Sequence, residues 1–188
     1  MADSDRGHLL VNLLTGSRLV FAVVVAVLVP WAAEEPWAIL VATALVGAVE
    51  LSDLLDGHLA RRHNVVSEFG KVFDPYADSV SRLTVYWALA MMGRSLYIVP
   101  LVMAVRDISV SYVRIVMMKR GWDGSARFAG KLKALVQGLA GLALMSGPLW
   151  WGGAGRAIII GLSLAVIAVC VYSGADYGSL LVRTPEHK

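Results

Sequence analysis

The stretch from Asp53 to Asp78, DLLDGHLARRHNVVSEFGKVFDPYAD, decides how this chain folds and where its chemistry lies. It holds four aspartates in two pairs, Asp53 with Asp56 and Asp74 with Asp78, and each pair borders a strongly apolar segment. Residues three or four apart share one face of a helix, so the two carboxylates of each pair point the same way. A connector that turns the chain back between the pairs predicts one four-carboxylate pocket between two antiparallel helices.

The composition around this stretch is that of an integral membrane protein. The chain has 188 residues, of which 57% are hydrophobic and only 16% charged, and its mean hydropathy is +0.66. A soluble domain of this length is less apolar and more charged. The net charge of +3 comes from basic residues that flank apolar segments, which favours contact with anionic lipid and not with nucleic acid. The single cysteine, Cys170, excludes a disulfide within the chain.

Six apolar stretches are long enough to cross a bilayer as helices, which takes about 20 residues each. They cover residues 17–33, 36–55, 74–92, 96–118, 131–151 and 157–181. Residues 9–16 predict a short amphipathic helix on the membrane surface before the first span. The polar start of the chain lacks the features of a removable signal peptide. We therefore expect an all-α integral membrane protein with six transmembrane helices, in a single domain covering residues 1–188.

The distribution of lysine and arginine predicts the orientation of these spans. The side that holds both termini is rich in basic residues, whereas the opposite side carries only Arg94 and Arg156. Short loops with more lysine and arginine stay in the cytoplasm. Both termini, and with them the acidic motif at the ends of the second and third spans, are therefore expected on the cytoplasmic side of a bacterial inner membrane.

Four acids at membrane depth need compensation, since unpaired they cost on the order of 10 kcal/mol. Oxygen ligands suit hard cations such as Mg²⁺, Mn²⁺ or Ca²⁺. Four carboxylates are enough for two ions, an arrangement that clamps phosphoryl oxygens in displacement reactions. Next to them, Gly57 allows a ligand to approach the backbone closely, and the planar fork of Arg61 suits a diphosphate.

The complete pattern, D-x2-D-G-x2-A-R-x8-G-x3-D-x3-D, resembles the signature of the CDP-alcohol phosphotransferase family and matches it at every specified position. The resemblance implies six transmembrane helices, usually in a homodimer. It also implies a reaction in which an acceptor hydroxyl attacks the lipid-bearing phosphate of a CDP-linked donor and releases CMP. By position, Asp53, Asp56, Asp74 and Asp78 correspond to ligands of Mg²⁺ or Mn²⁺, with two ions expected. Asp78 also corresponds to the general base, and Gly57, Arg61 and Ser67 to contacts of the CDP donor.

Basic residues in the second half of the chain bear on the acceptor. Arg106 and Arg114 share span four, and Lys131 and Lys133 begin span five. Cations inside a membrane are functional candidates, and here they favour an anionic acceptor such as a phosphomonoester. Order and spacing resemble bacterial phosphatidylglycerophosphate synthases, which transfer a phosphatidyl group from CDP-diacylglycerol to sn-glycerol 3-phosphate. That match adds Asn12 and Thr15 to the donor contacts and assigns Arg106, Arg114 and Lys131 to the acceptor phosphate.

The chain departs from this pattern at two positions near the last aspartate. Ser79 replaces the lysine that usually follows it, and Arg82 lies one helical turn beyond Asp78. Arg82 either supplies the missing charge or pairs with Asp78 or Asp107, and the sequence favours neither interpretation. Other acceptors, among them inositol phosphate and serine, stay open, and so does a different class of protein, a cation-coupled membrane transporter.

Overall fold

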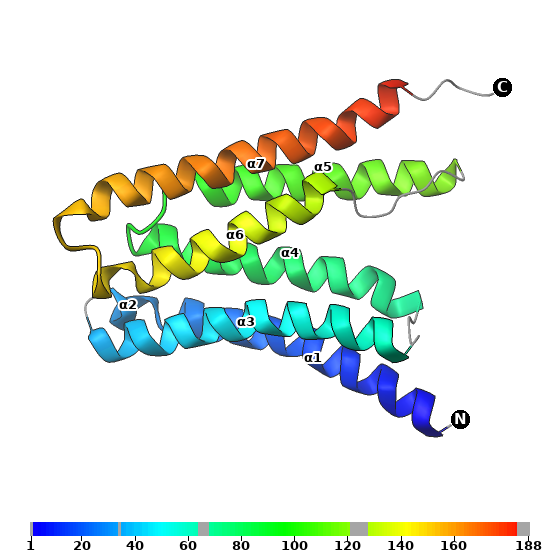
Figure 1. Cartoon of the computed structure of the whole chain (residues 1–188), viewed down its shortest axis with the longest axis horizontal. Helices are drawn as coiled ribbons and strands as arrows, with labels where there is room; N and C mark the ends of the chain where they lie inside the picture. The colour runs from blue at the N-terminus through cyan, green and yellow to red at the C-terminus, as the bar shows by residue number, and fades with distance from the viewer. Residues whose placement is uncertain (1, 34, 64–67, 121–127, 184–188) are drawn as a thin grey trace.

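The computed structural model describes residues 2–33, 35–63, 68–120 and 128–183, and these ranges are helical throughout apart from short turns. The elements in chain order are α1 (Ala2–Val27), α2 (Val29–Ala32), α3 (Pro36–His63), α4 (Glu68–Met91), α5 (Ile98–Lys119), α6 (Phe128–Ser146), the 3₁₀ turns η1 (Gly147–Leu149) and η2 (Gly152–Ala154), and α7 (Gly155–Arg183). The long helices lie side by side in an elongated bundle, with both ends of the chain at the same end of it (Figure 1). The all-helical fold predicted from the sequence is confirmed.

The bundle consists of two groups of three helices. α1 packs against α3 and α4, while α7 packs against α5 and α6. Contacts of α6 with α3 and α4, and of α5 with α4, join the two groups along one seam. This seam matters for function because the acidic motif belongs to the first group and the basic residues of α5 and α6 belong to the second.

The acidic motif is more helical than expected. From the sequence we expected the connector between the two pairs of aspartates to run from Gly57 to Phe73. That expectation is wrong, because α3 continues through Gly57 to His63 and α4 already begins at Glu68. One glycine inside a helix costs only about 1 kcal/mol, and the alanine and arginines that follow it favour helix. Every specified position of the motif therefore lies on one of two helices.

The start of the chain also differs from expectation. Residues 9–16 are continuous with the first long helix and form no separate segment. Gly16 lies inside this helix and does not interrupt it. The first helix ends at Val27, before the predicted end at residue 33, and the short α2 with Pro30 near its start follows.

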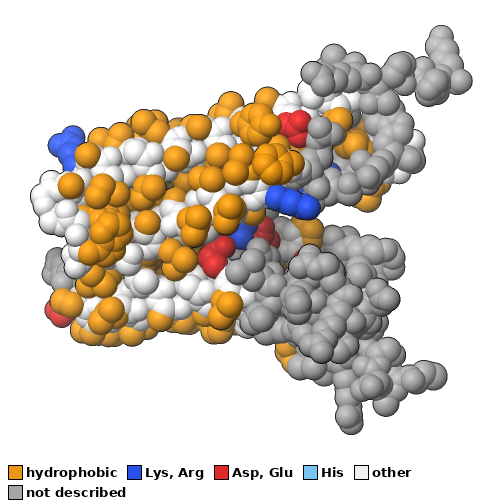
Figure 2. All heavy atoms as spheres, in the orientation of Figure 1, with side chains coloured by type: hydrophobic (Ala, Val, Ile, Leu, Met, Phe, Trp, Pro, Cys, Tyr) orange, Lys and Arg blue, Asp and Glu red, His pale blue; other side chains and the backbone are white. Residues whose placement is uncertain are grey.

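Polarity is distributed as in a protein surrounded by lipid. Buried side chains include Arg18, Arg82, Arg94 and Lys133, whereas large apolar side chains such as Leu139 stay exposed. In Figure 2 apolar side chains cover much of the visible face of the bundle. Two helical segments, Phe128–Leu149 and Gly152–Leu180, are long and apolar enough to cross a membrane, and Thr15–Val27 and Pro36–Ser52 are shorter apolar helices.

The turn between α4 and α5 fastens the end of the bundle far from the termini. Gly93 has a φ of 68°, and the Arg94 amide donates to the Leu89 carbonyl at 2.8 Å, the closing bond of a Schellman motif. The buried Arg94 guanidinium donates to the carbonyls of Ala32 and Met145. One side chain thus connects the end of α2 with the end of α6.

Candidate active site

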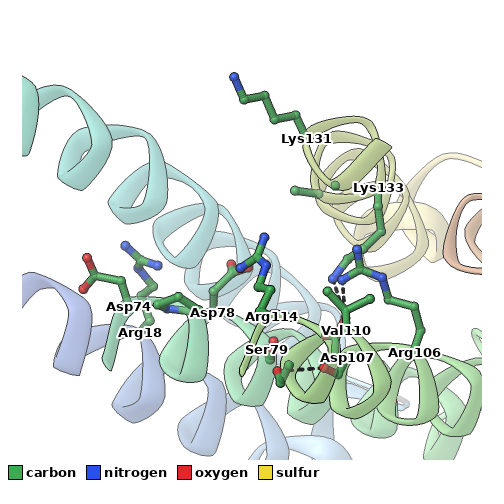
Figure 3. A pocket seen from close by; sticks show the side chains of 14 residues that line it. Arg18, Asp74, Asp78, Ser79, Arg106, Asp107, Val110, Arg114, Lys131 and Lys133 are labelled. Atoms are coloured by element: carbon green, nitrogen blue, oxygen red, sulfur yellow. Dashed lines mark hydrogen bonds and ion pairs between the residues drawn. The ribbon is translucent and has the colours of Figure 1, made fainter. Parts of the chain in front are cut away.

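A cavity of about 290 Å³ lies on the seam between the two helix groups. Its charged and hydroxyl lining comes from four helices: Arg18 of α1, Asp74, Asp78 and Ser79 of α4, Arg106, Asp107, Ser111 and Arg114 of α5, and Lys131 and Lys133 of α6. Five of these side chains are basic and three are acidic. Figure 3 shows Asp74 and Asp78 on one side of the cavity and Arg106 and Asp107 on the other. The cavity therefore has an acidic and a basic part, and its basic residues are in excess.

The acidic part is built on the first turns of α4. Asp74 and Asp78 are one turn apart, as predicted, and both line the cavity. The buried Thr15 hydroxyl of α1 donates to Asp74 Oδ1 at 2.9 Å. This bond fixes the carboxylate and leaves its remaining lone pairs for a ligand. Thr15, predicted as a donor contact, thus touches one of the predicted metal ligands in this structure.

Arg82 connects Asp78 to a further acid that the sequence did not single out. Its Nη1 lies 3.0 Å from each oxygen of Asp78. Its Nε and Nη2 donate to the two carboxylate oxygens of Glu50 on α3, at 3.2 and 3.0 Å. Of the two partners considered from the sequence, Arg82 binds Asp78, and Asp107 is engaged elsewhere.

The basic part is organised around Asp107. Its Oδ1 accepts from Arg106 Nη1 at 2.8 Å and from Lys133 Nζ at 2.9 Å. Arg106 also donates to the Ser173 hydroxyl of α7. Lys133 is buried in this ion pair, so its charge is already matched by a carboxylate.

Arg114 and Lys131 complete the basic part in different ways. Arg114 Nη2 donates to the Tyr177 hydroxyl at 2.8 Å, and the Tyr177 ring also lies 5.7 Å from the Arg106 guanidinium. Lys131 is exposed at the edge of the cavity, and in Figure 3 its chain extends away from the other labelled residues. The three residues predicted to hold the acceptor phosphate therefore line one cavity.

Several predicted residues cannot be placed at the level of side chains. Asp53, Asp56, Gly57 and Arg61 lie on α3, and Asn12 lies on α1, but the described side chains do not include theirs. Ser67 lies outside the described residues altogether. Within the side chains that are described, no group of three metal-ligating residues occurs. The proposed four-carboxylate centre is thus represented here by its α4 half alone.

The cavity also contains residues that sequence reasoning left out of the site. Arg18 is almost fully buried and lines the acidic part; its position three residues after Thr15 was the available signal. Asp107 and Tyr177 hold arginines, but a sequence does not reveal which side chains meet across helices. The same holds for Glu50, which lies one turn before the motif on α3.

Comparison with known proteins identifies the relatives of this chain. The profile of the CDP-alcohol phosphatidyltransferase family matches residues 8–172. The chain belongs to this family. It is therefore an enzyme of phosphatidyl transfer, and its apolar helices are those of a membrane protein.

Three relatives with assigned names show how similar this chain is to individual enzymes. A probable phosphatidylglycerophosphate synthase of Mycobacterium tuberculosis is 32% identical over 178 residues, which is 93% of this chain and 82% of the relative. Over shorter regions, enzymes named CDP-diacylglycerol--glycerol-3-phosphate 3-phosphatidyltransferase are similar in Mycoplasma genitalium and Bacillus subtilis. The Mycoplasma genitalium enzyme is 39% identical over 46% of this chain and 37% of its own length. The Bacillus subtilis enzyme is 31% identical over 50% of this chain and 49% of its own length.

Proposed function

We propose that the protein transfers a phosphatidyl group from CDP-diacylglycerol to sn-glycerol 3-phosphate, releasing CMP and forming phosphatidylglycerophosphate. The observation that carries this proposal is the cavity itself, in which two motif aspartates face a cluster of basic residues. An acceptor that brings both a hydroxyl and a phosphate matches such a two-part site. The names of the relatives support the same acceptor.

The carboxylate set fits one or two divalent cations, Mg²⁺ or Mn²⁺. Asp74 and Asp78 present oxygens to the cavity from successive turns of α4. Asp53 and Asp56 lie three residues apart on α3, in the second half of that helix. The helices α3 and α4 are antiparallel, and each carries one half of the motif. When bound, the ions would neutralise the diphosphate of the donor and polarise the phosphoryl group that is transferred. Oxygen-only ligands favour these hard cations over softer metals.

Asp78 is the residue we assign to proton removal from the acceptor hydroxyl. Within the acidic part it is the aspartate nearer to Arg114, so an acceptor held by its phosphate would present its hydroxyl there. A carboxylate acts as general base when it lies within hydrogen-bond reach of the proton. The other motif residues, Gly57 and Arg61 with Asn12, Thr15 and Ser67, are proposed to bind the CDP group.

Arg106 and Arg114 are proposed to hold the acceptor phosphate, with Lys131 at the edge of the cavity. Two guanidinium groups with fixed orientation suit a phosphomonoester, because each offers parallel N–H donors. Asp107, Ser173 and Tyr177 hold the two arginines in place before the acceptor arrives. Preorganised charges of this kind stabilise a developing negative charge without rearrangement.

We further propose that the six long helices span a bacterial cytoplasmic membrane as one domain of residues 1–188, with both termini in the cytoplasm and a homodimer as the working form. The cavity then opens near the inner leaflet, where a water-soluble acceptor meets a lipid donor. The excess of basic residues around the termini supports this orientation.

Release of CMP by the purified protein tests the proposal. The protein in detergent micelles with CDP-diacylglycerol and Mn²⁺ is offered glycerol 3-phosphate, inositol phosphate, serine or no acceptor. We expect CMP with glycerol 3-phosphate, and a loss of at least about a hundredfold in Asp78→Asn. Release of CMP with another acceptor alone would refute the acceptor assignment, and an inactive wild type with every acceptor would refute the enzyme proposal.

A further inference from the structure

The Glu50–Arg82 pair is a buried charge arrangement that the proposed mechanism does not yet use. The side chains of Arg82 and Glu50 are 5% and 20% exposed. The Arg82 guanidinium donates two hydrogen bonds to the Glu50 carboxylate. The third nitrogen, Nη1, is the one that contacts both oxygens of Asp78. A single arginine therefore joins α3 to the carboxylate that we assign to catalysis.

The bundle makes room for this pair at Gly138 on α6. A Cβ atom at Gly138 would fall on the carboxylate of Glu50. Glu50 thus reaches the place where α3, α4 and α6 meet because α6 has no side chain there. At the next turn of the same helix, a Cβ at Gly141 would meet Tyr86 only at an ordinary contact distance of 3.7 Å. The space is specific to the glutamate.

The charges of the three groups show what the pair does. Arg82 alone would place one full positive charge against Asp78, and Glu50 balances that charge from the opposite side. Nη1 lies 3.0 Å from both oxygens of Asp78, so it holds the carboxylate by both of its oxygens and not by one alone. The guanidinium is planar and its position is fixed by the fork on Glu50, so it restricts the rotation of the Asp78 carboxylate.

We propose that Arg82 and Glu50 are positioning residues, which hold the Asp78 carboxylate in the orientation that metal binding and proton removal require. The inference rests on the proposed function and deepens it, because it assigns roles to two residues outside the motif. Arg82 lies on α4 about one turn beyond Asp78 and Ser79, which line the cavity. It acts through Asp78 and does not itself contact the substrate.

Three variants and one control test the proposal in the full-length protein. Arg82→Met removes the contact with Asp78 and keeps the apolar stem; Arg82→Lys keeps the charge but loses the fork; Glu50→Gln keeps the shape of the side chain. Arg94→Met is the matched control, because Arg94 is an equally buried arginine that donates to backbone carbonyls at the far end of the bundle. CMP release gives kcat and KM, loss of the free Mn²⁺ signal in electron paramagnetic resonance gives metal affinity, and thermal unfolding gives the folded fraction.

We expect kcat to fall at least about tenfold in Arg82→Met, with KM for both substrates within about threefold and weaker Mn²⁺ binding. Arg82→Lys should recover part of the loss, and Glu50→Gln should show a smaller loss of the same kind. Arg94→Met should lower the unfolding temperature while kcat per folded molecule stays unchanged. The comparison of kcat with unfolding temperature separates a positioning role from a purely structural one. If Arg82 were only structural, Arg82→Met would behave like the control.

The proposal is overturned if Arg82→Met keeps kcat within about threefold of wild type, keeps its Mn²⁺ affinity, or loses activity only in step with its folded fraction. If Arg82→Met does not fold, Glu50→Gln decides by the same criteria. A wild type that releases no CMP contradicts the proposed function instead, and the Mn²⁺ affinities still compare the variants. The two failures are therefore distinguishable.

Discussion

Tyr177 is the residue that best shows how the basic part of the cavity is held together. Its hydroxyl accepts from Arg114, and the guanidinium groups of Arg106 and Arg114 lie 5.7 and 5.2 Å from the centre of its ring. Two like charges on one ring repel each other, and the electron-rich face of the ring and the carboxylate of Asp107 offset that repulsion. The ring therefore sets the spacing of the two arginines.

Tyr177→Phe should raise KM for glycerol 3-phosphate about tenfold and leave KM for CDP-diacylglycerol nearly unchanged. The variant deletes one hydrogen bond to a charged group, worth about 1.5 kcal/mol, and keeps the ring. Tyr177→Leu, which removes the ring as well, should have the larger effect. Steady-state CMP release with each substrate varied measures both constants, and Tyr172→Phe on the exposed face of α7 is the control. Equal changes in both KM values would contradict a role confined to the acceptor.

Removal of divalent ions should abolish CMP release, and Mg²⁺ or Mn²⁺ should restore it. The reason is that the motif offers several carboxylates to a diphosphate of the same sign, which only cations can bring together. Asp74→Asn should need a higher Mn²⁺ concentration for half-maximal activity, since Asp74 faces the cavity. Activity that persists in excess chelator would exclude the proposed role of the metal.

At the scale of helices, α6 controls how closely the two groups approach. Its glycines meet different neighbours, since Gly138 meets Glu50 of α3 and Gly141 meets Tyr86 of α4; just beyond α6, Gly147 of η1 meets the ring of Trp151. Small residues allow this close packing in a membrane, where helices gain little from hydrophobic burial against one another. The surroundings of Gly138 and Gly141 are those of residues at which helices pack closely.

Gly138→Ala should lower stability and activity, whereas Gly141→Ala should be neutral or slightly stabilising. The first alanine collides with a carboxylate that Arg82 holds in place, and the second has ordinary contact distances and gains up to about 1 kcal/mol of helix propensity. Thermal unfolding in detergent measures the stability of both variants, and CMP release measures their activity. Identical behaviour of the two variants would show that Glu50 moves aside freely.

At the scale of the whole molecule, the spans and their orientation are testable by chemical labelling. In a background with Cys170→Ser, Gly153→Cys should react with a membrane-impermeant maleimide added to intact cells. Lys119→Cys should react only after the membrane is permeabilised, because the proposed orientation puts the basic ends of the helices in the cytoplasm. Both positions are exposed in the bundle. Labelling of both from outside would contradict the six-span arrangement with internal termini.

Much of this architecture was predictable because it depends on local pattern. Apolar length predicted the long helices, and the spacing of Asp74 and Asp78 predicted their shared face towards one cavity. The pairing of Glu50 with Arg82 was not predictable, since it depends on the register of α3 against α4. The charge balance of Lys133 by Asp107 depends likewise on how α5 meets α6. A sequence fixes which charges exist, and packing decides which of them remain available to a ligand.

Arg94 distinguishes the two ends of the bundle, because it connects helices at one end only. Its hydrogen bonds to the carbonyls of Ala32 and Met145 connect α2 with α6 at the end of the bundle away from the cavity. Loss of these bonds should therefore make the bundle easier to unfold from that end, while the charged cavity near the termini keeps its arrangement.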